Sequence, residues 1–437
     1  MKAMKQSWML IWGLIFLGIL PLQAQNNPRE YGKNIVKELT SEKFAGRGYV
    51  DNGMNKAADY IAQEFQKLGI NPINGTYFQE FSMPINIIKN AELSLNGNRL
   101  KYGIDFIVKP NSKSQNFQQK EIYYFDPIAY ANALPNEKDF IAFIQNDFDA
   151  QINKHIVFPP HKFDIDSLNQ YYKHWPNFYK SEENKDRAIF FFTKDKLTAS
   201  LSQSQEGIAQ FFIQEKYYSH PLQIDDYRIE SEFNPEFKAR NVVGMIEGKN
   251  KDSIIVITAH YDHLGKVGET IFPGANDNAS GTAFLLSLAK HYAKKQPNYT
   301  LVFIAFAAEE AGLIGSYHFA ENPMVDLRKI KFLLNFDIMG AGEEGIQIVN
   351  SSIFTKEYEL LNQINSKKNY VKQIKKRGES CNSDHCPFYK KGVPSFFTYT
   401  LGGKGYYHDP FDTGNSIDLQ EFNPLQKLFI EFIDTLN

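Results

Sequence analysis

Apolar runs alternate with amphipathic segments along the second half of the chain. Near-continuous runs of β-branched, aromatic and aliphatic residues lie at 241–248, 253–260, 300–307, 329–340, 345–350 and 393–400. Segments with helical spacing lie between or after them, at 278–295 and at about 312–321, 355–367 and 418–436. Strands that are covered on both faces need such apolar runs. The pattern therefore predicts an α/β fold with a mixed, mostly parallel sheet flanked by helices.

Two regions with a different pattern come earlier in the chain. Residues 54–70 carry apolar side chains at helical spacing and reach a stop at Gly69, which predicts a helix that packs by one face on a larger body. Residues 86–235 are polar, aromatic and irregular, with short alternating strands. This stretch predicts an inserted β-rich domain.

The first 24 residues have the layout of an export signal. Two lysines precede an apolar run from Trp8 to Leu20, and Ala24 offers a cleavage point. We expect removal of residues 1–24 and a periplasmic or extracellular mature chain. An uncleaved anchor is the alternative, but the run is short for a membrane span and no later stretch approaches that length. Stable membrane insertion after signal removal is not expected.

Composition excludes some partners and leaves other questions open. A formal net charge of -2 over 437 residues gives no nucleic-acid footprint. Cys381 and Cys386 are the only cysteines, and in an oxidising compartment they could form a local disulfide or remain a free pair. They are too few for a thiolate metal site. The oligomeric state is not predicted.

Acidic and imidazole side chains gather where the predicted strands end. They are His260 with Asp262, Glu309 with Glu310, Asp337, and, beyond a glycine-rich loop, Tyr407 with His408. Another acid, Asp277, opens the helix after the first of these strands. Ligands bind at the carboxyl ends of the strands in open α/β sheets, so these side chains should converge if the strands are parallel.

This set of side chains suits zinc, and one carboxylate can bridge two ions about 3.5 to 4 Å apart. The five candidate ligands are His260, Asp277, Glu310, Asp337 and His408. Glu309 is then free to act as a general base on water, and Asp262 could orient the ring of His260. Taken singly, Asp277 could be only a helix N-cap and Glu309 with Glu310 an exposed strand end. The combination favours the metal site, and His263 and His318 are interpreted as structural.

Several motifs resemble those of the M28 family of co-catalytic zinc peptidases, which includes secreted bacterial aminopeptidases. They are AHYDHLG, GANDNASGTA, FAAEEAGLIGS, NFDIMG, SDHCPFYKKGVPSFF and YYHDPFDT, and LTSEKFAGRG resembles the family's N-terminal part. The resemblance is specific over about 236–420 and unclear over 85–235, where many relatives carry a protease-associated domain. It implies an N-terminal part of the catalytic domain at 25–85, an insertion at 86–235 that could act as a lid, and the catalytic domain proper at 236–437.

The resemblance also implies roles for individual residues. His260 and Asp337 would bind one zinc ion, Glu310 and His408 the other, and Asp277 would bridge the two.

Other positions follow from the same resemblance. Glu309 would be the general base, and Tyr407 would donate a hydrogen bond to the tetrahedral oxyanion. A cis peptide is expected after Asp277, and Asp384 in the SDH motif would lie near the pocket without binding metal. Asp409 departs from the family, whose members commonly have Thr or Ser there.

We therefore expect an exported binuclear zinc metallopeptidase that acts on peptides as an aminopeptidase. One alternative is a glutaminyl cyclase-like enzyme with a single zinc ion. Another is a non-catalytic binding protein on the peptidase fold. The sequence does not indicate which side chain or which peptide end is recognised.

Overall fold

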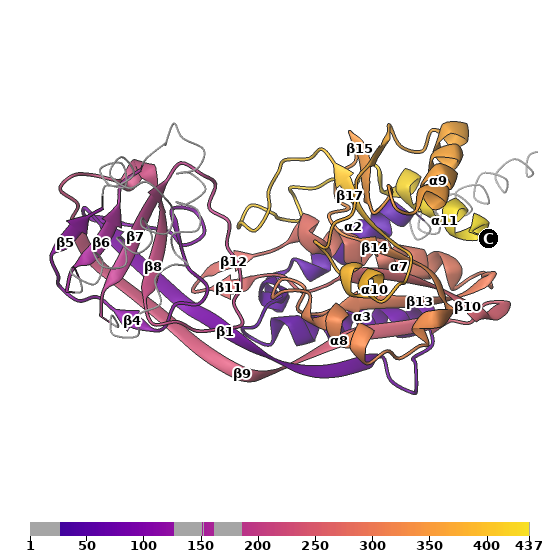
Figure 1. The fold of residues 1–437 in the computed structure, drawn as a ribbon, viewed down its shortest axis with the longest axis horizontal. Helices are drawn as coiled ribbons and strands as arrows, with labels where there is room; N and C mark the ends of the chain where they lie inside the picture. Colours follow the sequence, from indigo (N-terminus) through magenta and orange to yellow (C-terminus); the bar gives the residue numbers. More distant parts are fainter. Residues whose placement is uncertain (1–26, 126–150, 152, 161–185, 437) are drawn as a thin grey trace, which may run out of the picture.

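The computed structural model describes residues 27–125, 151, 153–160 and 186–436 of the 437-residue chain. A large α/β domain and a smaller β domain lie side by side and are joined by a long two-stranded ribbon (Figure 1). The predicted signal peptide at 1–24 lies outside the described residues. Within the described part of the chain, no helix combines the length and the apolar character needed to span a bilayer.

One mixed sheet forms the centre of the large domain, with the strand order β16-β15-β17-β14-β10-β13-β9-β1-β2 and with β4 beside β9. Its central strand β10 (Asn250–His260) runs parallel to β13 (Tyr299–Phe306) and to β14 (Ile330–Phe336). Strand β17 (Ser395–Leu401) runs parallel to β14. Four strands thus end at the same edge, where a ligand site is expected.

The remaining strands of this sheet lie toward its two sides. They are β1 (Phe78–Leu95), β2 (Asn98–Arg99), β4 (Gln115–Asn116), β9 (Ile224–Ile246), β15 (Gly345–Val349) and β16 (Ile374–Lys376). A small antiparallel hairpin, β11 (Gly265–Val267) with β12 (Thr270–Phe272), follows β10.

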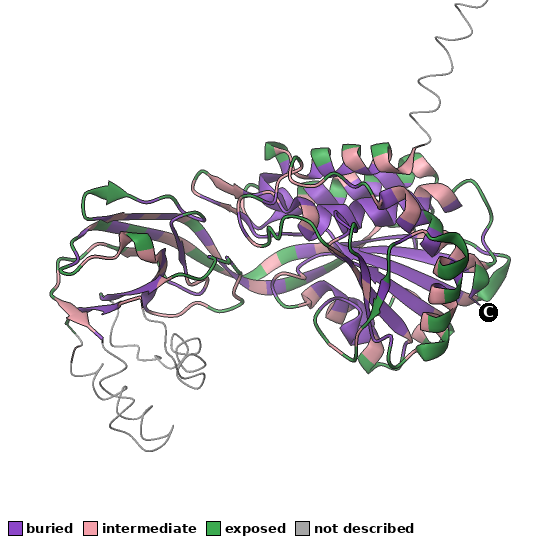
Figure 2. Ribbon diagram, turned by 90° about the horizontal axis from the view of Figure 1, so that it is seen from above, coloured by how far each residue is buried: buried purple, intermediate pink, exposed green. Residues whose placement is uncertain are grey.

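Helices cover both faces of the sheet (Figure 2). One layer contains α2 (Pro28–Leu39), α3 (Gly53–Leu68), α7 (Gly281–Tyr292), α9 (Thr355–Lys368) and α11 (Phe422–Thr435). The opposite layer contains α8 (Ile314–Glu321) and α10 (Cys386–Lys390). Along β13, Phe303 packs into the first layer and Ile304 into the second, the alternation expected of a strand. The predicted α/β class is confirmed.

The expected helices appear with shifted ends. The helix predicted over 54–70 is α3, and it ends because Gly69 takes a left-handed conformation with φ 72°. The helix predicted over 278–295 begins only at Gly281, because residues 275–280 form an irregular π-type turn. The short strand β16 was not predicted, since only three residues pair there.

A second sheet, of order β3-β8-β7-β6-β5, builds the smaller domain. Its strands are β3 (Phe106–Val108), β5 (Ile122–Tyr124), β6 (His155–Phe158), β7 (Ala188–Thr193) and β8 (Ala209–Gln214). Neighbouring strands from β5 to β8 run parallel, and β3 is antiparallel to β8. Buried aromatic residues such as Phe190 and Phe211 stack in its own core. We call the part of the chain between the two ribbon strands β1 and β9, at 96–223, the inserted domain.

The ribbon of β1 and β9 passes without interruption from the main sheet into the inserted domain. The predicted boundaries at residues 85 and 235 fall inside these strands. The register shifts between Met83 and Ile85, where Pro84 and Pro235 stand at the same level. Proline has no backbone N–H, so each strand loses a ladder donor there.

The hairpin β11–β12 makes a second connection between the domains. Leu264, Val267 and Phe272 from this region are buried in the hydrophobic core of the inserted domain. The two domains therefore share apolar packing as well as the ribbon.

Candidate metal centre

The five predicted ligands converge at the carboxyl edge of the sheet around the carboxylate of Asp277. His260 Nε2 lies 3.4 Å from Asp277 Oδ1 and 3.3 Å from Asp337 Oδ1. His408 Nε2 lies 3.2 Å from Asp277 Oδ2 and 2.9 Å from Glu310 Oε2. Each oxygen of Asp277 therefore faces a different imidazole–carboxylate pair.

Some of these buried atoms have no hydrogen-bond partner. Within the described part of the chain, Asp337 Oδ1 and His408 Nε2 are buried and make no hydrogen bond. Buried polar atoms are normally satisfied, so each such atom needs an explanation. Imidazole nitrogen and carboxylate oxygen are zinc ligands, and bound cations would satisfy both atoms. The residues present therefore fit a zinc site.

The charge of the cluster also favours a bound cation. Burial raises the pKa of Glu309 well above its usual value, and neighbouring carboxylates add to that effect. Burial alone would lower the pKa of His408, but Glu310 and Asp277 outweigh burial and raise it to about 11. Without a bound cation, much of the carboxylate charge must be balanced by protons. A dication would supply that positive charge.

The backbone around Asp277 is held by an aspartate that sequence reasoning missed. The peptide bond from Asp277 to Asn278 is cis, which confirms that expectation. The carboxylate of Asp412 accepts hydrogen bonds from the backbone N–H of Asn276 at 2.9 Å and of Asp277 at 3.0 Å. Asp412 lies in the YYHDPFDT motif, which was the available signal.

Arg47 was also missed, although the LTSEKFAGRG motif contains it. Its guanidinium is fully buried and donates to the carbonyl oxygens of Leu39, Tyr261, Pro273 and Gly274 at 2.6 to 3.1 Å. Burial lowers its pKa to about 10, against the opposing effect of nearby carboxylates. Arg47 thus ties the segment after β10 to the segment that leads into Asp277.

A chain of side chains crosses the strands to reach Asp337. Thr258 Oγ1 donates to Asn335 Oδ1 at 2.7 Å, and Asn335 Nδ2 donates to Ser383 Oγ at 2.8 Å. Ser383 Oγ in turn donates to Asp337 Oδ2 at 3.2 Å. Oδ1 of Asp337 is left to face His260.

The loop that carries Ser383 is closed by a disulfide between Cys381 and Cys386. The neighbouring Asp384 is fully buried, and burial raises its pKa to about 7. The predicted supporting position of Asp384 is thus inside the protein, next to a residue that contacts a ligand.

Asp262 and His263 support the ligand loops in different ways. The backbone carbonyl of Asp262, rather than its carboxylate, is the nearer group to His260 Nδ1, at 3.3 Å. The carboxylate of Asp262 accepts hydrogen bonds from the backbone N–H of Glu309 at 3.1 Å and of Glu310 at 3.3 Å. His263 Nδ1 lies 2.7 Å from Glu310 Oε1, so this histidine belongs to the site. Only its spacing in the HYDH motif could have indicated this.

The two predicted catalytic residues lie at the same cluster. Glu309 has a carboxylate oxygen within 4.8 Å of potential ligand atoms of His260 and Asp337. The ring of Tyr407 stacks on His408 with centroids 3.9 Å apart, and Tyr407 is 44% exposed. His318, by contrast, stacks on Phe81 from α8.

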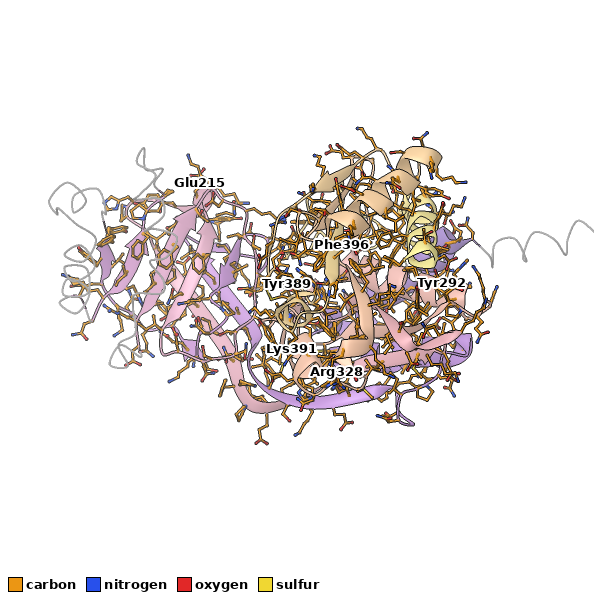
Figure 3. The ribbon with its side chains drawn as sticks, turned by 45° about the vertical axis from the view of Figure 1, so that its right-hand side comes forward. Glu215, Tyr292, Arg328, Tyr389, Lys391 and Phe396 are labelled. Atoms are coloured by element: carbon orange, nitrogen blue, oxygen red, sulfur yellow. A yellow bond between two sulfur atoms is a disulfide. The ribbon has the colours of Figure 1, made fainter. Side chains whose placement is uncertain are left out.

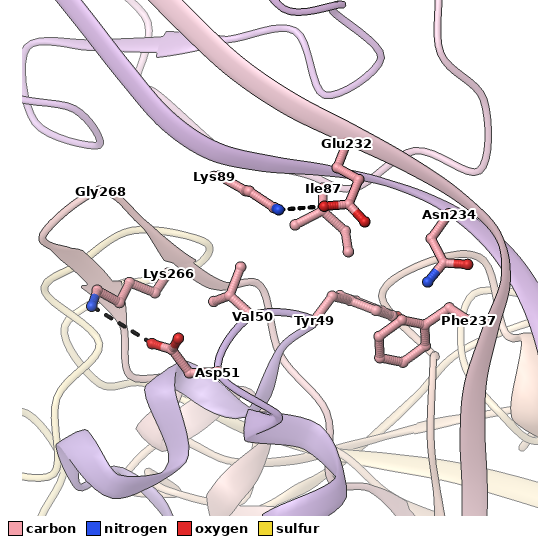
Figure 4. Close-up of a pocket in the computed structure, with 10 residues that line it drawn as sticks. All are labelled: Tyr49, Val50, Asp51, Ile87, Lys89, Glu232, Asn234, Phe237, Lys266 and Gly268. Carbon is pink, nitrogen blue, oxygen red and sulfur yellow. Dashed lines mark ion pairs between the residues drawn. The ribbon is translucent and has the colours of Figure 1, made fainter.

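A cavity of about 500 Å³ lies beneath the ribbon, between its strands and residues 49–51 (Figure 4). Its two lysines are already paired, Lys89 with Glu232 and Lys266 with Asp51. A narrower recess lined by residues 199–201 of the inserted domain shares several residues with this cavity. The inserted domain thus forms part of the wall of this recess.

The described geometry can be compared with known proteins. Residues 241–433 match the model of peptidase family M28. This region is an M28 peptidase domain. The predicted family is confirmed, and the M28 domain contains all five predicted ligands.

Sequence relatives include aminopeptidase YwaD of Bacillus subtilis, which is 27% identical over 265 residues, or 54% of this chain and 55% of that protein. A probable leucine aminopeptidase of Trichophyton verrucosum is 29% identical over 220 residues, or 47% of this chain and 58% of that protein. The match thus spans little more than half the length of these relatives.

Solved structures show the same fold over nearly the whole chain. The Peptidase M28 precursor from Shewanella amazonensis superposes with a TM-score of 0.68 at 18% identity, covering 96% of this chain and 95% of that one. BSAP, a zinc aminopeptidase from Bacillus subtilis, gives a TM-score of 0.64 at 19% identity, with coverages of 92% and 94%. The likeness includes the inserted domain, where the sequence motifs gave no clear signal.

Proposed function

We propose that this protein is an exported aminopeptidase that uses two zinc ions. The observation that carries the proposal is that the two oxygens of Asp277 face different imidazole–carboxylate pairs. His260 and Asp337 would hold one ion and His408 and Glu310 the other, with Asp277 bridging them. Zinc in such a site polarises the scissile carbonyl and lowers the pKa of water.

The chain's own residues would handle the protons. Glu309 would take a proton from the attacking water and pass it to the departing amine. Its raised pKa and its place beside His260 and Asp337 support this role. The hydroxyl of Tyr407, next to His408, would donate a hydrogen bond to the oxyanion.

The inserted domain would act as a lid that admits chain ends and excludes long chains. Residues 199–201, which line a recess beside the M28 domain, support that role. The basic and apolar segments in residues 1–24 support export. The Cys381–Cys386 disulfide is also typical of an oxidising compartment.

Metal content and substrate profile test the proposal together. We expect two zinc ions per chain by elemental analysis, hydrolysis of aminoacyl reporter substrates and free peptides, and loss of this hydrolysis with a chelator. A single tightly bound zinc ion together with cyclisation of N-terminal glutamine would contradict the proposal and indicate a glutaminyl cyclase.

The Glu309→Gln variant tests the general base. It keeps the size of the side chain but cannot accept the proton, so we expect kcat to fall by about 100-fold or more while both zinc ions stay bound. Glu359→Gln, at an exposed position on α9, is the matched control. Wild-type hydrolysis by Glu309→Gln would remove Glu309 from the mechanism.

A further inference from the structure

One segment of the inserted domain reaches across the M28 domain to its ligand loops. Residues 196–203, which we call the strap, follow β7 and precede β8. Lys196 and Gln203 are exposed, whereas Leu197 and Ala199 between them are buried. The strap is thus anchored by its middle and is not a freely projecting loop.

The middle of the strap pairs with the ligand His408. The backbone N–H of Ala199 donates to the carbonyl oxygen of His408 at 3.1 Å. In the other direction, His408 Nδ1 lies 2.9 Å from the carbonyl oxygen of Ala199. A carbonyl can only accept, so Nδ1 donates a hydrogen bond and Nε2 is the nitrogen that faces Asp277 and Glu310, where it would bind zinc.

The two ends of the strap fasten further loops. Lys196 Nζ donates to the carbonyl oxygen of Gly405 at 3.0 Å and lies 2.5 Å from the buried carboxylate of Asp409. At the other end, Gln203 Nε2 donates to the carbonyl oxygen of Ala311 at 2.8 Å, directly after Glu310. The strap therefore contacts both loops that supply the Glu310 and His408 ligands.

His408 needs such support because of its backbone. It has φ 52°, in the left-handed region that costs a residue with a side chain free energy. Asp409 also accepts the backbone N–H of Tyr407 and of Phe411, at 3.2 and 2.9 Å. The ion pair with Lys196 holds the carboxylate of Asp409, which shapes this turn. Asp409 is also the position at which the sequence departs from the family pattern.

We propose that the strap of the inserted domain is a positioning element of the metal centre, which orients His408 and so sets the affinity for the zinc ion held by Glu310 and His408. The proposal rests on the proposed function. It assigns the inserted domain a role in metal binding that is separate from any role as a lid.

The test measures zinc affinity by competition with a chromophoric chelator in the full-length protein. Lys196→Met keeps the aliphatic stem but removes the charge, and Ala199→Pro removes the N–H that His408 accepts. We expect each variant to bind one of the two zinc ions about 10-fold more weakly and the other with wild-type affinity. The matched control is Lys194→Met, because Lys194 pairs at 3.5 Å with Glu215, which also belongs to the inserted domain (Figure 3).

A double-mutant cycle identifies which ion is affected. Glu310→Ala removes a ligand of the second ion, so adding Lys196→Met to it should not change the affinity for the remaining zinc. The strap proposal is overturned if the folded Lys196→Met and Ala199→Pro variants bind both ions as wild type does. It is also overturned if Lys196→Met weakens the binding of the zinc ion that remains in the Glu310→Ala variant. A wild-type protein with one zinc site would instead defeat the proposed function, and this proposal with it.

Discussion

At the scale of single residues, the candidate metal centre depends on groups that are not themselves candidate ligands. Asp412 holds the backbone before and at Asp277, and Ser383 holds one oxygen of Asp337. Arg47 holds the backbone of the segment after β10 and of the segment that leads into the turn with Asp277. These bonds are buried or partly buried, so the loss of one leaves a polar group that water cannot easily reach.

Arg47→Ala should destabilise the fold. It leaves four carbonyl oxygens without their donor, and we expect a loss of about 3 kcal/mol or more in the free energy of unfolding. Urea denaturation followed by circular dichroism measures it. Arg328→Ala is the control, since Arg328 is 90% exposed by its side chain. Equal stability of the two variants would show that Arg47 is not needed to hold this segment.

At the scale of elements, each ligand stands where regular structure stops. Positive φ occurs at Ala308 just before Glu309 and Glu310, at Ile338 just after Asp337, and at His408 itself. These turns bring the side chains back over the sheet edge, and neighbouring groups must hold them because the conformation is unfavourable. The loop from 381 to 386 is one such support, since its disulfide limits the freedom of Ser383.

The double variant Cys381→Ser with Cys386→Ser tests this loop. A short disulfide loop of this kind contributes about 2 kcal/mol by restricting the unfolded chain, so we expect stability to fall by that amount. Ser383 would then position Asp337 less firmly, so the affinity for the zinc ion that His260 and Asp337 would hold should also fall. Asn382→Ser, at an exposed position in the same loop, is the control. Unchanged urea midpoint and zinc affinity in the double variant would contradict this.

At the scale of the whole molecule, the inserted domain and the M28 domain are built into one another. Leu264, Val267 and Phe272 lie in the core of the inserted domain, and the strap reaches back to His408. Deleting residues 86–235 would therefore expose apolar side chains and remove the strap at the same time. Single substitutions in the strap separate these effects, which a deletion cannot do.

Zinc should stabilise the whole chain, and more so at high pH. In the metal-free protein the pKa of His408 is raised to about 11, so this imidazole is protonated at neutral pH and zinc must displace its proton. Zinc affinity should therefore rise as pH rises toward that pKa and fall as pH falls. We expect the Tm difference between zinc-buffered and chelated protein to be larger at pH 9 than at pH 6, by differential scanning fluorimetry. A difference that grew at low pH would contradict the displacement of a proton.

The sequence by itself determined the α/β class, the M28 family and the five candidate ligands that the structure brings together. Apolar runs such as 300–307 reveal a strand covered on both faces, because burial on both sides leaves no polar positions. His260 and Glu310 could be picked out as candidate ligands because imidazole and carboxylate groups bind zinc and both residues follow apolar runs. The left-handed stop at Gly69 was local and therefore predictable as well.

Only the tertiary structure decided which oxygen of Asp277 faces which histidine. It also decided that Asp262 supports Glu309 and Glu310 through their backbone, and that His263 contacts Glu310. These contacts join segments about which local pattern says nothing, since a hydrogen bond across the fold leaves no periodic trace. The link from Ala199 to His408 spans 209 positions of the chain, and only folding brings those two residues together.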